Sequence, residues 1–187
     1  MKSRILKFKN PKEVVVDTNK SEEKYVLVEV NVRDRDVKLP IFLSVGEGAR
    51  IVCVVIVSIT GTGSVLLNSK QIHNAQEGYS DFLCKTVVKD GKFSYNGVIE
   101  ITKKGNHSHA YQRNENLVIG EGGVVTSEPL LEIQAHEVFC THGATISAPS
   151  EDELYYLMTR GLSFQKSEDL IVDGFLKSGI EKLTTNY

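Results

Sequence analysis

Residues 51–57 form an uninterrupted apolar run, Ile-Val-Cys-Val-Val-Ile-Val. β-Branched side chains favour extended backbone, and a strand without polar alternation is typical of one that is covered on both faces. The longer apolar stretch, residues 51–59, is still far too short to span a bilayer, so we expect no membrane segment. The chain must therefore place other structure on both sides of this strand.

Most of the sequence before residue 150 has the same β character. Valine at every second position of residues 26–32 predicts a strand with one apolar face and one half-exposed face. Glycine-containing turns punctuate the strands at residues 46–48, 61–63, 90–91, 96–97, 104–105 and 120–123. Many short strands with such turns fit a sandwich, a barrel or a β-solenoid. No fixed-length repeat is visible, so the residues alone leave this choice open.

The pattern changes to helical from residue 150. Ser150 and Glu153 have the spacing of a capping box, and Gly161 is a helix stop. We expect Ser167 to cap a second helix, whose apolar stripe extends over residues 170–180. Two short helices cannot bury these stripes against each other alone. They must dock on the β region or on a partner.

Composition excludes several classes of protein. The 187 residues carry a net charge of −2 with acids and bases mixed, which argues against a nucleic-acid partner. Three cysteines are too few for a disulfide framework, and we expect Cys53 to be inert core and Cys84 an ordinary strand residue. Residues 1–9 do not resemble a secretory signal, so we expect a soluble cytoplasmic protein. Neither a Walker loop nor a nucleophile elbow is present, and no independent enzyme is indicated.

A thiol and an imidazole lie two residues apart at Cys140 and His142. In an extended segment His136, Val138, Cys140 and His142 share one face, because side chains alternate with a period of two. One interpretation is a soft metal or cluster site, or a sulfur relay. The other is a buried structural cysteine beside a satisfied histidine, which is the commoner outcome for such a short motif.

A second pair of imidazoles is formed by His107 and His109. Together with Cys140 and His142 they could complete a metal site. A polar loop explains them equally well, and the spacing does not decide.

Six motifs follow one another along the second half of the chain, at residues 114–117 (Asn-Glu-Asn-Leu), 127–133 (Ser-Glu-Pro-Leu-Leu-Glu-Ile), 140–145 (Cys-Thr-His-Gly-Ala-Thr), 151–157 (Glu-Asp-Glu-Leu-Tyr-Tyr-Leu), 160–163 (Arg-Gly-Leu-Ser) and 174–176 (Gly-Phe-Leu). In this order they resemble the SufB/SufD family, the scaffold components of the SUF iron–sulfur cluster assembly machinery. The resemblance is specific over residues 80–178 and general before them.

This resemblance implies a mainly β protein, a right-handed parallel β-helix with a small C-terminal α-helical region. Residues 1–149 would form the β-helix core, and residues 150–187 would dock a SufC-like ATPase. The partner would supply ATP hydrolysis, so the chain itself would be non-catalytic. The docking residues that we expect are Leu154, Leu157, Met158, Leu170 and Phe175.

Within the family the chain is more similar to SufD than to SufB. The assembly cysteine of SufB falls on Gly123, and the glutamate after its histidine falls on Gly143. Cys140 and His142 match the Cys-x-His pair of SufD. The resemblance implies that they contribute to a nascent cluster at an interface with a SufB-like subunit or a second copy of this chain. No cofactor would be bound stably, only a transient iron–sulfur cluster in the assembled complex.

Family members usually have a longer N-terminal part, so this chain is expected to be a minimal homologue with different assembly partners. Two alternatives to a scaffold subunit stay open. It could instead be a stand-alone metal-binding β-solenoid using His107, His109, Cys140 and His142. It could also be a purely structural homologue without assembly chemistry.

Overall fold

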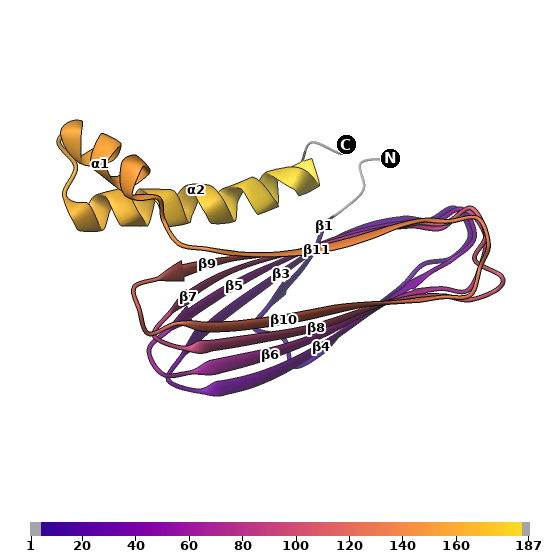
Figure 1. Ribbon diagram of the computed structural model, residues 1–187. Helices are drawn as coiled ribbons and strands as arrows, with labels where there is room; N and C mark the ends of the chain where they lie inside the picture. Colours follow the sequence, from indigo (N-terminus) through magenta and orange to yellow (C-terminus); the bar gives the residue numbers. More distant parts are fainter. Residues whose placement is uncertain (1–4, 185–187) are drawn as a thin grey trace.

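The computed structural model describes residues 5–184, so residues 1–4 of the expected β-helix core and residues 185–187 of the expected helical region lie outside it. Parallel strands wind into a flattened solenoid of two facing sheets, followed by two helices (Figure 1). The expected β-solenoid with a C-terminal helical region is confirmed. Sheet A contains β1 (Ile5–Lys9), β3 (Glu23–Arg33), β5 (Arg50–Thr60), β7 (Tyr79–Lys89), β9 (His109–Ile119) and β11 (Phe139–Ser147), in that order. Sheet B contains β2 (Val14–Asp17), β4 (Asp36–Val45), β6 (Ser64–His73), β8 (Lys92–Ile101) and β10 (Val124–Ile133).

Successive turns of the solenoid are not equally long. In sheet B, Val14 pairs with Ile41, an offset of 27 residues, whereas Lys92 pairs with Val124, an offset of 32 residues. A parallel pairing requires that the two strands be in register, but the loops between them can differ in length. This variation explains why the sequence shows no fixed repeat although the structure is repetitive.

Strand β5 is buried on both faces, as its apolar run predicts. Cys53 and Val55 point into the core between the two sheets, and Val52 and Val54 belong to a separate cluster on the outer face of sheet A. The helix α2 (Phe164–Thr184) covers that outer face, contributing Leu183 to the cluster. Each fully buried aliphatic side chain contributes roughly 1.5–3 kcal/mol, so both faces stabilise the fold.

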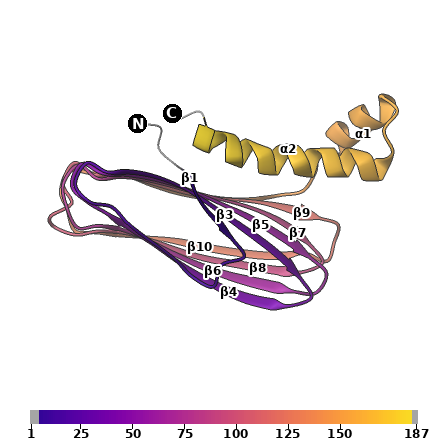
Figure 2. The ribbon, with the colours of Figure 1, turned by 180° about the vertical axis from the view of Figure 1, so that it is seen from behind.

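Helix α2 forms a third layer on sheet A (Figures 1 and 2). The layer is held by apolar contacts and by ion pairs to the strands, of which Lys182 with Asp81 of β7 is the shortest at 2.5 Å. Gly179 allows a close approach, because a Cβ there would lie 3.0 Å from Cδ of Lys85 and 3.2 Å from Cδ1 of Ile56. Within residues 5–184 no helix is long and apolar enough to cross a membrane.

Helix α1 (Glu151–Thr159) packs on α2 and lies away from both sheets (Figures 1 and 2). Gly161 ends it with φ +91°, and the Gly161 and Leu162 amides donate to the carbonyl groups of Met158 and Leu157, the pattern of a Schellman motif. The stop predicted at Gly161 is therefore confirmed. At the N-terminal end, Ser150 occupies the cap position but makes no side-chain capping bond.

The predicted cap of the second helix was wrong. Helix α2 begins at Phe164, so Ser167 lies inside its first turn, where its hydroxyl donates to the Ser163 carbonyl at 3.1 Å. The Ser163 hydroxyl accepts a bond from the Lys166 amide at 3.4 Å and takes the capping role. Ser167 is fully buried, because this turn faces sheet A.

Candidate functional site

Cys140 and His142 lie on β11, the edge strand of sheet A, whose only neighbour among the described strands is β9. In this pairing Cys140 is in register with Ala110 and His142 with Gln112. Ala110 and Gln112 are buried on the inner face of β9, so Cys140 and His142 also belong to the inner face of their sheet. The strand thus places both side chains on one face, as alternation predicts.

The two side chains differ in exposure. Cys140 is half-buried against Ile99, Ile101 and Ala110, and this burial raises the pKa of its thiol to about 11. His142 is exposed. The raised pKa favours the protonated thiol at neutral pH, so a thiolate there would need a nearby cation to stabilise it.

The second pair of histidines lies elsewhere. His109 starts β9 with its ring on the outer face of sheet A, stacked on Phe139 with 4.8 Å between ring centres. His107 lies in the preceding turn, and its Nδ1 is 3.3 Å from a carboxylate oxygen of Glu137. With His136 these residues line a hollow of about 410 Å³.

The two Cys/His sets are therefore not brought together. His109 lies on the opposite face of sheet A from Cys140 and His142, and His107 lies in the turn before β9. His136 belongs to the bend before β11, so its expected place on the strand face with Cys140 is wrong. Within residues 5–184 no three His, Cys, Asp or Glu side chains are placed to hold a metal ion.

The other two cysteines are core residues. Cys53 and Cys84 are fully buried between the sheets, and burial raises the pKa of both thiols, that of Cys84 to about 12. The interpretation of Cys53 as inert core is confirmed. Neither thiol lies on the surface that carries Cys140.

A row of buried polar side chains faces inward from β9, behind the edge strand. Gln112, Asn114 and Asn116 are almost completely buried, and each has one amide atom without a hydrogen-bond partner in the protein. The Asn116 amide donates to Asn114 at 2.7 Å and to the Thr145 carbonyl of β11 at 2.9 Å. Sequence reasoning missed this row, although amides at every second position of a strand were a visible signal.

Apolar side chains are also exposed along the open edge. Phe139 of β11 is 66% exposed, and Ile146 of the same strand and Leu130 and Ile133 of β10 are exposed as well. An unpaired strand edge with exposed apolar side chains is a template for strand addition by another chain.

The helices present a second apolar surface. Tyr155, Tyr156, Met158, Phe164 and Leu170 are exposed, and a hollow of about 450 Å³ lies between α1 and α2. We call these five residues the helical apolar surface.

The expected docking residues fall into two groups. Met158 and Leu170 belong to the helical apolar surface, and Leu154 and Leu157 are half-buried. Phe175 packs on the outer face of sheet A, with the Lys85 ammonium 4.2 Å from its ring centre. Phe175 therefore anchors α2 to sheet A, whereas Tyr155 and Tyr156, which are absent from the expected set, are exposed.

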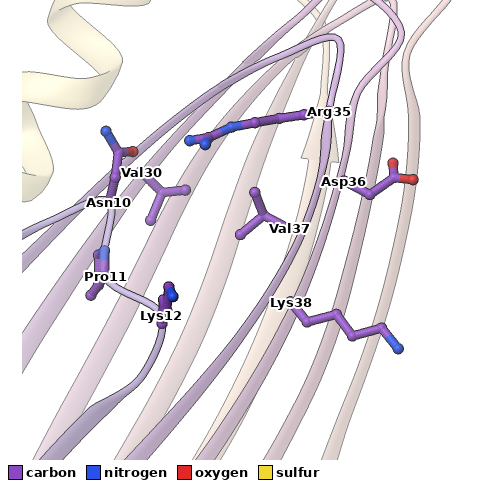
Figure 3. A pocket seen from close by; sticks show the side chains of 8 residues that line it. All are labelled: Asn10, Pro11, Lys12, Val30, Arg35, Asp36, Val37 and Lys38. Carbon is purple, nitrogen blue, oxygen red and sulfur yellow. The ribbon is translucent and has the colours of Figure 1, made fainter.

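A further hollow, of about 430 Å³, lies at the first turn of the solenoid (Figure 3). It exists because β1 pairs only with Tyr25–Glu29 of β3, which leaves Val30 and Val37 near its floor. The side chain of Arg35 extends toward Asn10 there. None of the predicted site residues contributes to this hollow.

The fold and the edge strand define a β-solenoid of the scaffold type, with a Cys-x-His pair at its open edge. The profile of the family "SUF system FeS cluster assembly, SufBD core domain" matches residues 14–175. The chain therefore belongs to the SufBD family of iron–sulfur cluster assembly proteins, as its motifs predicted.

Individual relatives agree with this assignment. The chain is 32% identical over 117 residues to the iron-sulfur cluster assembly protein SufD of Escherichia coli K12, a match that covers 62% of this chain and 25% of the relative. It is 28% identical over 152 residues to SufBD family proteins of Staphylococcus saprophyticus and of Staphylococcus aureus USA300. Those two matches cover 80% of this chain and 32% of each relative. The chain thus matches a quarter to a third of the length of these proteins.

Proposed function

We propose that the chain is a SufD-like scaffold subunit whose edge strand β11 contributes to the site where a nascent iron–sulfur cluster is assembled. The observation that carries this proposal is the placement of Cys140 and His142 together on the inner face of an unpaired, accessible strand edge. The cluster is cargo in this function.

The second chain is a SufB-like subunit or another copy of this chain. The exposed Phe139 and Ile146 beside the site support strand addition there, since burial of such side chains stabilises an interface. At the aligned position of the SufB cysteine, a Cβ on Gly123 would lie 2.8 Å from Cγ1 of Val118. The scaffold therefore has no room for a sulfur-receiving side chain there without rearrangement. A partner that supplies that cysteine fits this arrangement.

The experiment for the site uses the assembled complex of this chain, a cysteine-bearing SufB-like subunit and a SufC-like ATPase. Cluster formation is followed by visible absorbance and iron content. We expect the double variant Cys140→Ala, His142→Ala to lose most of the cluster formation. Thr141→Ala changes the outward-facing residue between them and is the matched control. Unchanged cluster formation in the double variant would remove the site from the mechanism.

The helical apolar surface is proposed to dock the ATPase. It is exposed on α1 and α2, and its acidic neighbours Asp152 and Glu153 line the same hollow. Movement of the ATPase on hydrolysis would be transmitted through α2 to sheet A, on which that helix packs. The chain itself would carry out no hydrolysis.

Co-purification with the ATPase tests this docking surface. Tyr155 and Leu170 are 72% and 51% exposed, so Tyr155→Asp and Leu170→Asp should leave the fold intact and abolish association. Val15 on β2 is 55% exposed and far from the helices, so Val15→Asp is the control. Retained association in both helix variants would show that the ATPase binds elsewhere.

A further inference from the structure

A chain of buried hydroxyl and amide groups crosses the solenoid interior from sheet B to β9. The hydroxyl groups of Ser69 and Tyr95 are 2.8 Å apart, and the amide nitrogen of Gln112 donates to the Tyr95 hydroxyl at 2.7 Å. All three side chains are at least 97% buried. A Cβ at Gly97 would collide with the Gln112 amide and the Tyr95 hydroxyl, so this glycine leaves the space that they occupy.

The carbonyl oxygen of the Gln112 side chain has no hydrogen-bond partner in the protein, although it is buried. An unpaired buried acceptor costs roughly 1–3 kcal/mol, so a partner is expected near it. The in-register neighbours of Gln112 along sheet A are Phe82 on one side and His142 on the other. Phe82 has no donor, whereas an imidazole always carries at least one N–H.

General strand geometry allows this contact. Neighbouring strands lie about 4.8 Å apart, and in-register side chains on the same face are adjacent. His142 is exposed on the edge strand, so its ring can turn toward β9 without displacing a packed neighbour.

We propose that Gln112 is a positioning residue for His142, accepting a hydrogen bond from one ring N–H so that the other ring nitrogen is held free and directed away from β9. A fixed tautomer is what a histidine needs to act as a ligand or proton acceptor at a defined place. The role of that free nitrogen toward the cluster rests on the function proposed above, whereas the hydrogen bond between Gln112 and His142 is independent of that function.

The hydrogen bond is tested on the full chain by ¹⁵N NMR of the His142 ring at pH 9, where imidazole rings are neutral. We expect one dominant tautomer in the wild type and a mixture of the two in Gln112→Met, which has a similar size but no acceptor. Gln112→Glu keeps an acceptor oxygen and should restore the dominant tautomer. Gln71→Met removes another fully buried glutamine, which bonds Ser80 instead, and should leave the His142 signals unchanged.

Identical tautomer ratios in the wild type and Gln112→Met would overturn the proposal. A general loosening of the fold would move the ratio in Gln71→Met as well, which would equally count against a specific contact. In the assembled complex, Gln112→Met should lower cluster formation about tenfold, as expected for a residue that orients a ligand. If the tautomer changes but His142→Ala assembles clusters normally, the hydrogen bond stands and the proposed function of the edge site fails.

Discussion

Lys182 of α2 and Asp81 of β7 form an ion pair that is largely buried between the helix and sheet A, with 2.5 Å between Nζ and Oδ2. Burial lowers the pKa of Lys182, and the bond to Asp81 opposes this effect. The pair therefore joins the C-terminal half of α2 to the middle of the solenoid. Removing one partner leaves the other charge in a poorly solvated interface.

We predict that Asp81→Leu lowers the free energy of unfolding by about 3 kcal/mol, because the Lys182 ammonium loses its counter-ion. The double variant Asp81→Leu, Lys182→Met should recover most of this loss. Urea unfolding measures both. Lys177 and Asp173 form an exposed pair on the same helix, so Lys177→Met should change stability far less than Asp81→Leu does, because solvent screens an exposed pair. Equal effects of Asp81→Leu and Lys177→Met would contradict the assigned importance of the buried pair.

Two glycines of α2 should respond oppositely to substitution. A Cβ at Gly174 would meet no atom within 4 Å, so Gly174→Ala should stabilise the protein by about 0.5–1 kcal/mol through helix propensity. Gly179 lies against Lys85 and Ile56, so Gly179→Val should destabilise it by about 1–3 kcal/mol through overpacking. Thermal unfolding of the two variants compares them directly. A gain in stability for Gly179→Val would show that α2 does not pack closely on sheet A at this position.

The three cysteines should differ in reactivity. In the folded chain Cys140 alone is expected to react with iodoacetamide, slowly at pH 7.5 and faster as the pH rises toward its pKa of about 11. Cys53 and Cys84 are fully buried and should react only after unfolding. Mass spectrometry of peptides gives the rates, and Cys140→Ser should abolish labelling of the folded chain. Rapid labelling of Cys140 at pH 7 would contradict the half-buried position of its thiol.

His73 should make stability depend on pH. It is fully buried, its Nε2 is 2.7 Å from the Ser80 hydroxyl, and burial lowers its pKa to about 4. Between pH 4 and about 6.5 the unfolded chain binds a proton that the folded chain does not, so stability is lost as the pH falls through this window. Over this window His73 alone should lower the free energy of unfolding by about 3 kcal/mol.

Urea unfolding of the wild type and His73→Gln from pH 7.5 to 4 tests this dependence. The variant should show a shallower fall in stability than the wild type over that range. His136→Gln alters a histidine exposed on the surface and should keep the wild-type slope. Parallel curves for the wild type and His73→Gln would contradict the role of His73.

Much of the fold could be predicted locally. The covered strand around Val54, the alternating valines of β3 and the helix stop at Gly161 each follow from a few neighbouring residues and their backbone preferences. The cap at Ser167 could not be chosen correctly, because Ser163 has the same chemistry four residues earlier. Burial of Ser167 against sheet A, a tertiary effect, decided between them.

For the candidate site, too, part could be predicted from the sequence and part depended on the tertiary structure. Strand periodicity by itself determined that Cys140 and His142 share a face, and the order of motifs determined the family. Only the tertiary structure decided that this face lies at an open edge, that His109 lies on the other face of sheet A, and that Gln112 is the neighbour of His142. The reason is physical: side-chain alternation is a property of one strand, whereas the neighbours across a solenoid are set by pairing between strands about 30 residues apart, through loops of unequal length.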